Sequence, residues 1–179
     1  AELLLVGIGV LPDLGVAADA GLTTGDGIVV DGMMQSSVED IFAIGDVALV
    51  DGAMSRIESV DNAQNTAARA AAAICGLSQP PKMAPWFWSE QFDARLQSAG
   101  IVPQEAAAAQ YIVRPGKREG GLSVWSYDVH GKLAAIEAVR DPAAYMLGKK
   151  CLDLGLSPPP SEIGNAAFDL KGFVASGAV

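Results

Sequence analysis

The chain has 179 residues, with 12 Lys and Arg against 21 Asp and Glu, one His and two Cys. Its formal charge of −9 argues against nonspecific binding to nucleic acid or to an anionic membrane surface, because both attract clustered positive charge. The single His excludes His-based metal sites with two or more His ligands, and the wide spacing of Cys75 and Cys151 excludes zinc-ribbon and iron–sulfur ligation. We therefore expect no metal site. We also expect the two cysteines to be inert thiols of a reducing cytoplasm.

The chain opens on an apolar segment over residues 3–11, which is too short to span a membrane, since a spanning helix needs about 20 residues. No basic region precedes the segment, so it does not fit a signal peptide. Residues 3–6 predict a strand that is covered on both faces, as in a parallel sheet. Because the sequence enters this strand without a starting Met, we expect the chain to be the C-terminal piece of a longer protein.

The next elements have an α/β pattern. A short helix is expected over residues 17–20, and short strands are expected over 27–31 and 41–44. The second of these strands ends at Gly45-Asp46, much as the strand over 3–6 ends in glycine. Strands that end in this way resemble the edge of a nucleotide-binding sheet, where ligands lie beyond the carboxyl ends of the strands.

The strongest predicted element is a helix over residues 59–75. Ser59 is a good N-cap, the interior is rich in alanine, and Gly76 supplies the stop. The Pro-rich segment 77–81 then interrupts the pattern, and we place a domain boundary there.

Beyond this boundary the sequence predicts a small α+β domain with an antiparallel sheet. Strands are expected over residues 94–101, 110–113, 122–128 and 132–139, and the last two are joined by a tight turn at 129–131. A helix is expected to start at Asp141-Pro142 and to run to about residue 154, and a last short helix is expected over 168–174.

Two glycine-containing segments are candidate ligand positions. At Gly7-Ile8-Gly9 the glycines would let a nucleotide approach the backbone, although Pro12 stands where a dinucleotide fingerprint has its third glycine; the alternative is a simple strand end. Asp46 would accept hydrogen bonds from a polyol, and Gly45 would leave room for the ligand. The alternative for Asp46 is that it caps the following turn.

Two further segments have a structural and a functional interpretation. The start of the helix at Ser59 and Val60 has free N–H groups that favour negative charge, and the amide near Val60 would face the pyrimidine edge of a flavin; the alternative is an ordinary capped helix. The aromatic cluster over residues 85–92, which includes Trp88, would serve core packing, a planar cofactor or a partner surface.

Three motifs in series resemble the C-terminal part of the ferredoxin reductases of oxygenase systems. They are residues 41–46 (Ile-Phe-Ala-Ile-Gly-Asp), residues 58–60 (Glu-Ser-Val) with 62–63 (Asn-Ala), and residues 85–91 (Pro-Trp-Phe-Trp-Ser-Glu-Gln). These are FAD enzymes with a glutathione-reductase-like fold. The resemblance implies an α/β fragment of a fold with two dinucleotide-binding domains, followed by a small α+β domain. Residues 1–30 would finish the NAD-binding domain, 31–80 would belong to the FAD-binding domain, and 81–179 would form the C-terminal interface domain.

The resemblance also implies roles by position. Asp46, with Gly45, matches the contact to the ribityl and pyrophosphate region of FAD, and Val60, with Ser59, matches the backbone contact to the isoalloxazine ring. Gly7, Ile8 and Gly9 match the strand end beside the nicotinamide nucleotide, and Trp88 matches an aromatic residue near the flavin and the ferredoxin docking face. We list these as the cofactor-binding candidates and expect no catalytic residue in this chain.

The implied reaction passes a hydride from NAD(P)H to FAD and then single electrons to a [2Fe–2S] ferredoxin, with a homodimer as a further implied contact. Because both Gly-rich fingerprints of the family precede the matched part, we expect the chain alone to be inactive. An acidic ferredoxin would require a local basic patch, for which Arg56, Arg69 and Arg95 are candidates; the alternative is that they are ordinary surface charges.

Two other functions stay open. One is a related flavoprotein, such as an NADH oxidase, a nitrite reductase or a relative of apoptosis-inducing factor, and the other is a non-catalytic interaction module. Disulfide reductase chemistry fits poorly, because neither Cys has a partner at redox spacing.

Overall fold

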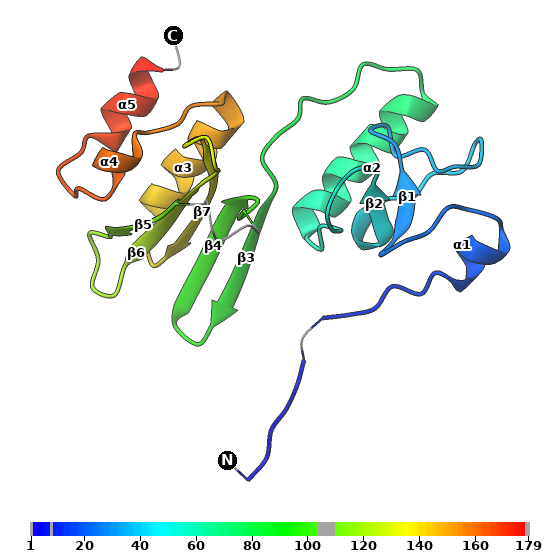
Figure 1. Ribbon diagram of the computed structural model, residues 1–179, viewed down its shortest axis with the longest axis horizontal. Helices are drawn as coiled ribbons and strands as arrows, with labels where there is room; N and C mark the ends of the chain where they lie inside the picture. The colour runs from blue at the N-terminus through cyan, green and yellow to red at the C-terminus, as the bar shows by residue number, and fades with distance from the viewer. Residues whose placement is uncertain (1, 8, 104–109, 178–179) are drawn as a thin grey trace. The chain divides into compact units, whose positions relative to one another are not determined.

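The computed structural model describes residues 2–7, 9–103 and 110–177 (Figure 1). The chain divides into two compact units, Ala1–Pro80 and Pro81–Val179, each with its own hydrophobic core. A parallel strand pair lies in the first unit and a five-stranded antiparallel sheet in the second, so the predicted α/β segment followed by an α+β domain is confirmed. None of the helices over the described residues is long and apolar enough to cross a membrane.

The first unit consists of short elements around one long helix. These are α1 (Gly15–Asp19), β1 (Ile28–Val30), the 3₁₀ turn η1 (Gly45–Val47), β2 (Ala48–Val50) and α2 (Val60–Ile74). The two strands pair in parallel, with Ile28 opposite Ala48. Their core consists of Val30, Met34, Ala43, Ala48 and Ala70, with Ile28 and Phe42 packed against it.

The helix predicted over residues 59–75 is confirmed as α2, and its ends follow from local chemistry. The Ser59 hydroxyl accepts the N–H of Asn62 at 3.1 Å, which satisfies one of the unpaired donors of the first turn. At the other end Cys75 is the C-cap, and Gly76 follows with φ of 64°, a conformation that glycine adopts without strain.

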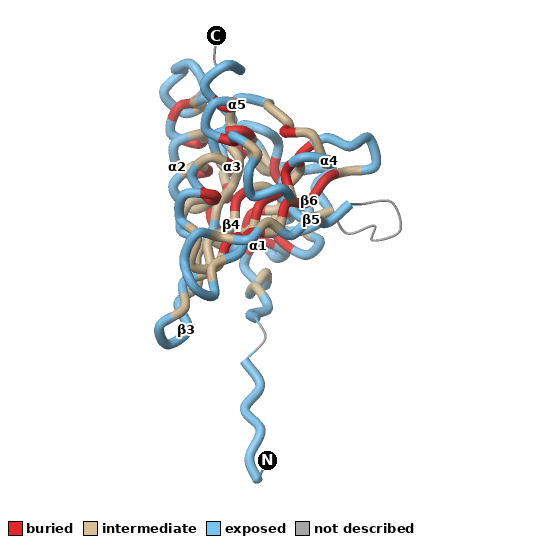
Figure 2. The backbone as a smooth tube through the Cα atoms, turned by 90° about the vertical axis from the view of Figure 1, so that its left-hand side faces the viewer, coloured by how far each residue is buried: buried red, intermediate tan, exposed pale blue. Residues whose placement is uncertain are grey.

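Two strands predicted in this unit are wrong. Residues 3–6 pair with no strand among the described residues, and their side chains are 68–86% exposed; Figure 2 shows this segment in the exposed colour. A buried parallel strand forms only between neighbouring strands, and no described segment supplies them. Residues 41–44 make only an isolated bridge between Phe42 and Gln35, because the chain turns at Gly45 (φ 70°) and the strand follows as β2.

The second unit is a sheet with helices on one face. Its strands are β3 (Trp86–Gln91), β4 (Ala94–Gly100), β5 (Gln110–Pro115), β6 (Leu122–Tyr127) and β7 (Leu133–Val139), in the order β3-β4-β7-β6-β5. The helices are α3 (Pro142–Leu154), α4 (Pro160–Ile163) and α5 (Leu170–Ser176). The four predicted strands, the β6–β7 hairpin, the long helix and the last helix are confirmed, whereas β3 and α4 were not predicted.

One cross-strand row shows how the second core is built. Trp86, Ala99, Ile136, Trp125 and Ile112 lie directly opposite one another across the five strands, on the face that the helices cover. A Cβ added at Gly148 of α3 would lie 2.5 Å from Ile136 Cδ1, so α3 approaches this face as closely as glycine allows.

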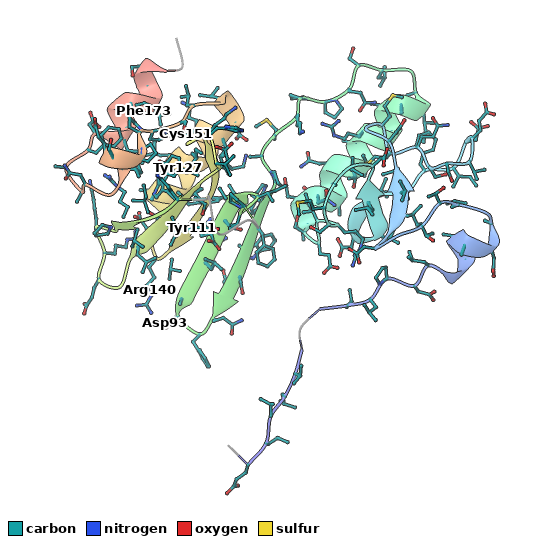
Figure 3. All side chains as sticks on the ribbon, in the orientation of Figure 1. Asp93, Tyr111, Tyr127, Arg140, Cys151 and Phe173 are labelled. Carbon is teal, nitrogen blue, oxygen red and sulfur yellow. The ribbon has the colours of Figure 1, made fainter. Side chains whose placement is uncertain are left out.

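Two polar contacts connect the later helices to the sheet. The Arg114 guanidinium donates to four main-chain oxygens between α4 and α5, those of Ile163 (2.8 Å), Asn165 (2.7 Å), Ala166 (3.3 Å) and Phe168 (3.0 Å). The Tyr127 hydroxyl donates to Pro158 O at 2.9 Å, and Tyr127 lies near Cys151 (Figure 3). Burial raises the pKa of both groups, that of Cys151 to about 11, so the Cys151 thiol stays protonated at neutral pH.

Candidate functional site

The candidate site of the first unit lies where η1 meets the start of α2. Gly45 is buried, and its N–H donates to Thr66 Oγ1 at 2.9 Å, while the Thr66 hydroxyl in turn donates to Asn62 O at 2.6 Å. A Cβ at Gly45 would lie 3.7 Å from the Cβ of Ala63, which is ordinary contact. The positive φ, rather than lack of space, is therefore what favours glycine here.

Asn62 connects this turn to the segment that enters α2. Its side-chain Nδ2 donates to Ile57 O at 2.8 Å and lies 3.4 Å from Gly45 O, while its N–H is capped by Ser59. The turn, the entering segment and the first turns of α2 thus form one hydrogen-bonded unit. Ser59 is placed at this site, but its hydroxyl is already used as the helix cap.

Two groups of this unit have no hydrogen-bond or ion-pair partner among the described residues. The Asp46 carboxylate is exposed and makes no hydrogen bond or ion pair, and η1 has no side-chain cap, so the alternative in which Asp46 caps the turn is not observed. The N–H of Val60, at the first position of α2, has no acceptor in the described structure, and the Val60 side chain is 54% exposed. The site therefore offers a carboxylate acceptor and a main-chain donor that are held on one scaffold.

This donor set fits the group that the sequence implied. A carboxylate suits the hydroxyl groups of a ribityl chain, and an N–H at a helix start suits an electron-rich ring edge. Gly45 places no side chain between the turn and α2. The residues present are therefore compatible with FAD.

Arg56 has a different position from the one predicted for it. Its side chain is 6% exposed, and Nη1 donates to the main-chain oxygen of Asp46 and contacts Glu58 Oε1 at 2.8 Å. Its Nε lies 3.4 Å from Asp26 Oδ2. A side chain this buried does not present charge to a partner, so the prediction that Arg56 belongs to a docking patch is wrong.

One sequence signal pointed to this burial. Nine acidic residues precede Arg56 and no Lys or Arg does, so the first cation of the chain has several anionic segments available as partners. The other two arginines predicted for a docking patch, Arg69 and Arg95, are more exposed than the Arg56 side chain. Arg69 is half-buried, with Nη1 3.4 Å from Gly32 O, and Arg95 is exposed and paired with Glu90 at 3.5 Å.

The structure does not bring Gly7 and Gly9 to this site. No atom beyond their chain neighbours lies within 4 Å of a Cβ built at either glycine, and both residues are exposed. Ile8 lies outside the described residues. These three positions therefore stay predictions.

Trp88 belongs to the second unit, on edge strand β3. Its ring stacks on that of Trp86, with centroids 5.4 Å apart and planes at 29°. Trp86 packs against the core, whereas Trp88 is half-buried and Phe87 between them is 45% exposed on the opposite face. The aromatic cluster thus combines core packing with exposed aromatic surface.

Family models match both units. Residues 1–67 match the pyridine nucleotide-disulphide oxidoreductase family, and residues 86–174 match the reductase C-terminal family. Together with the parallel strand pair and the unit of sheet and helices, these matches define the class. The chain combines a pyridine nucleotide-disulphide oxidoreductase part with a reductase C-terminal domain.

Individual relatives narrow this class. The chain is 36% identical to rhodocoxin reductase from Rhodococcus erythropolis, and the match covers 96% of this chain and 40% of that protein. It is 32% identical to putidaredoxin reductase from Pseudomonas putida, and the match covers 98% of this chain and 42% of that protein. It therefore spans about two fifths of the length of these relatives.

Solved structures of ferredoxin reductases match the chain over a similar share of their length. The crystal structure of the ferredoxin reductase for the CYP199A2 system from Rhodopseudomonas palustris is 39% identical, with a TM-score of 0.81 over 93% of this chain and 41% of that one. The matched chain in the crystal structure of the covalent putidaredoxin reductase–putidaredoxin complex is 31% identical, with a TM-score of 0.86. The match covers 100% of this chain and 43% of that chain. The chain belongs to the family of ferredoxin reductases such as rhodocoxin and putidaredoxin reductase, and it corresponds to their C-terminal portion.

Proposed function

We propose that the chain forms the C-terminal part of an FAD-dependent NAD(P)H:ferredoxin oxidoreductase that supplies an oxygenase system. The observation that carries the proposal is the pair of groups without a partner, the Asp46 carboxylate and the Val60 N–H. Both groups lie on segments that hydrogen bonds among Gly45, Asn62 and Thr66 connect to each other. Family membership and the series of matched motifs support it.

The redox chemistry of such an enzyme, hydride uptake from NAD(P)H and one-electron transfer to a [2Fe–2S] ferredoxin, is supplied by bound FAD. This chain's residues bind and orient. Asp46 accepts hydrogen bonds from ribityl hydroxyl groups beside the pyrophosphate, and the N–H of Val60 donates to the pyrimidine edge of the ring. Gly45 adopts the positive φ that the turn before Asp46 requires, and Ser59 fixes the start of α2.

The remaining assignments complete the proposal. Residues 1–30 finish the NAD-binding domain, with Gly7, Ile8 and Gly9 beside the nicotinamide nucleotide. Residues 31–80 belong to the FAD-binding domain and 81–179 form the interface domain, where Trp88 lies near the flavin. A complex of a homologous reductase with putidaredoxin supports a ferredoxin as the partner.

The distribution of charge favours the second unit for docking an acidic ferredoxin. Residues 1–80 contain 11 acidic and two basic residues, so the entire formal charge of −9 lies there. Residues 81–179 contain ten of each. An acidic partner is repelled less by the neutral unit, and Arg95 is the one of the three candidate arginines with an exposed guanidinium there.

The first test is the intact mass and visible spectrum of the isolated chain, followed by FAD titration of the full-length protein that carries it. We expect a mass near 18.4 kDa without flavin absorbance for the chain alone, and bound FAD in the full-length protein. In the latter, D46N should weaken FAD binding about tenfold, because a charged acceptor contributes ~1.4 kcal/mol or more. D51N is the matched control, since Asp51 is an exposed Asp beyond β2.

Two results would contradict the proposal. A full-length protein that binds no FAD would favour a non-catalytic interaction module. FAD binding that is equal in D46N and D51N would remove Asp46 from the site.

A further inference from the structure

We propose that Arg56 is a positioning residue, which fixes the turn carrying Asp46 relative to the start of α2. The inference rests on the proposed function, because it concerns the geometry of the FAD-contacting groups. Arg56 touches no ligand atom in this role. It acts through Asp46, whose main-chain oxygen it binds.

The guanidinium connects the segment that enters α2, to which Arg56 belongs, with two earlier segments of the chain. It contacts the Asp46 oxygen in η1, the Glu58 carboxylate next to the N-cap of α2, and the Asp26 carboxylate before β1. Nη1 makes the contacts with Asp46 O and Glu58, and Nε, which has no hydrogen-bond partner, makes the ion-pair contact with Asp26. A lysine has one nitrogen at the end of a flexible chain and does not reproduce contacts from two fixed nitrogen atoms. Arg56 therefore sets the distance between the turn and the helix start, while Asp46 keeps its own carboxylate free for other contacts.

Packing fixes the arginine itself. A Cβ added at Gly27 would lie 2.5 Å from Arg56 Cδ and 2.5 Å from Val47 O, so the aliphatic stem occupies the space beside a buried glycine. With 6% of the side chain exposed, few alternative rotamers remain, and a buried cation is tolerated because its carboxylate partners are close.

Electrostatics adds a second reason for an arginine at this position. Arg56 and Arg69 are the only basic residues among the first 80, against 11 acidic ones. Without Arg56, Asp26 and Glu58 would be uncompensated beside the Asp46 turn. Their repulsion would separate the loops, and their charge would oppose a pyrophosphate placed nearby.

The test uses the full-length reductase that carries this chain, with R56K as the variant. The measurements are the FAD dissociation constant from flavin fluorescence, the visible circular dichroism of bound flavin, and the melting temperature. We expect R56K to weaken FAD binding about tenfold and to change the visible dichroism, because the ring no longer lies in the same asymmetric environment.

R114K is the matched control. Arg114 is likewise an arginine that holds main-chain oxygens, but it lies in the second unit. R114K should lower the melting temperature and leave FAD affinity within twofold of the wild type. A general loss of stability would move both variants alike, whereas a positioning role affects FAD binding in R56K alone.

The outcomes separate the two proposals. If the wild type binds FAD and R56K matches it in affinity and dichroism, the role of Arg56 is refuted and the proposed function stands. If the wild type binds no FAD, both are refuted. If R56K does not accumulate as folded protein, E58Q decides, since it weakens one anchor of the guanidinium: FAD binding two- to fivefold weaker supports the role, and unchanged binding overturns it.

Discussion

Replacing Arg114 by Met should destabilise the second unit by about 3 kcal/mol. Of the four hydrogen bonds from its guanidinium, those to Ile163 O and Phe168 O are partly buried, and the other two are exposed. Water replaces the exposed bonds at little cost, whereas each partly buried bond to a charged donor contributes about 1.5 kcal/mol. Met keeps most of the stem volume, so the loss reports on the hydrogen bonds and not on a cavity.

Urea unfolding followed by tryptophan fluorescence measures this change in one unit only, because all three Trp lie in residues 81–179. With a slope of about 1.5 kcal/mol per M, the midpoint should fall by about 2 M at unchanged slope. The matched control is Arg95→Met, which removes an exposed ion pair of 3.5 Å and should cost about 0.5 kcal/mol or less. A loss below about 1 kcal/mol for Arg114→Met, or equal losses for both variants, would refute this account.

Other expectations follow from buried polar groups. Thr66→Val leaves the buried N–H of Gly45 without its acceptor and should cost about 1–3 kcal/mol in the first unit, measured by circular dichroism at 222 nm on denaturation, with the exposed Gln64→Ala as control. An alkylating agent at pH 8 should modify the exposed Cys75 quickly and the buried Cys151 only after denaturation; equal rates in the native chain would contradict the burial. Burial raises the pKa of Cys151 to about 11, so the unfolded chain loses the thiol proton at lower pH than the folded chain does. The free energy of unfolding is therefore unaffected by this group below about pH 9 and falls as the pH rises toward 11. Burial also raises the pKa of Tyr127, which changes the stability in the same direction. The tryptophan-monitored melting temperature should therefore fall between pH 9 and 11, and Cys151→Ala should show a shallower fall.

Elements with strong local signals were predicted well. The caps at Ser59 and Asp141 accept the N–H of the third residue after them, and both helices start as the sequence indicates. The turn after β6 is fixed by Asp128, whose carboxylate accepts the N–H groups of His130 and Lys132. Chemistry of this kind acts within four residues, so it can be read from the sequence.

Predictions that depended on distant neighbours were less reliable. The run over residues 3–6 has the composition of a buried strand, yet a strand needs partners that no described segment provides. Strand β3 was not predicted, because its aromatic and polar residues show no clear alternation and its pairing with β4 decides the conformation.

The sequence by itself determined the family, the four later strands and the two longer helices of the second unit, and the positions of Asp46 and Val60 in matched motifs. Only the tertiary structure decided that the Asp46 carboxylate lacks a partner while the Arg56 side chain is buried among Asp26, Asp46 and Glu58. The physical reason is that caps and turns use contacts along a few residues. Burial and ion pairing depend instead on which remote segments meet, and those contacts form only when the chain has folded.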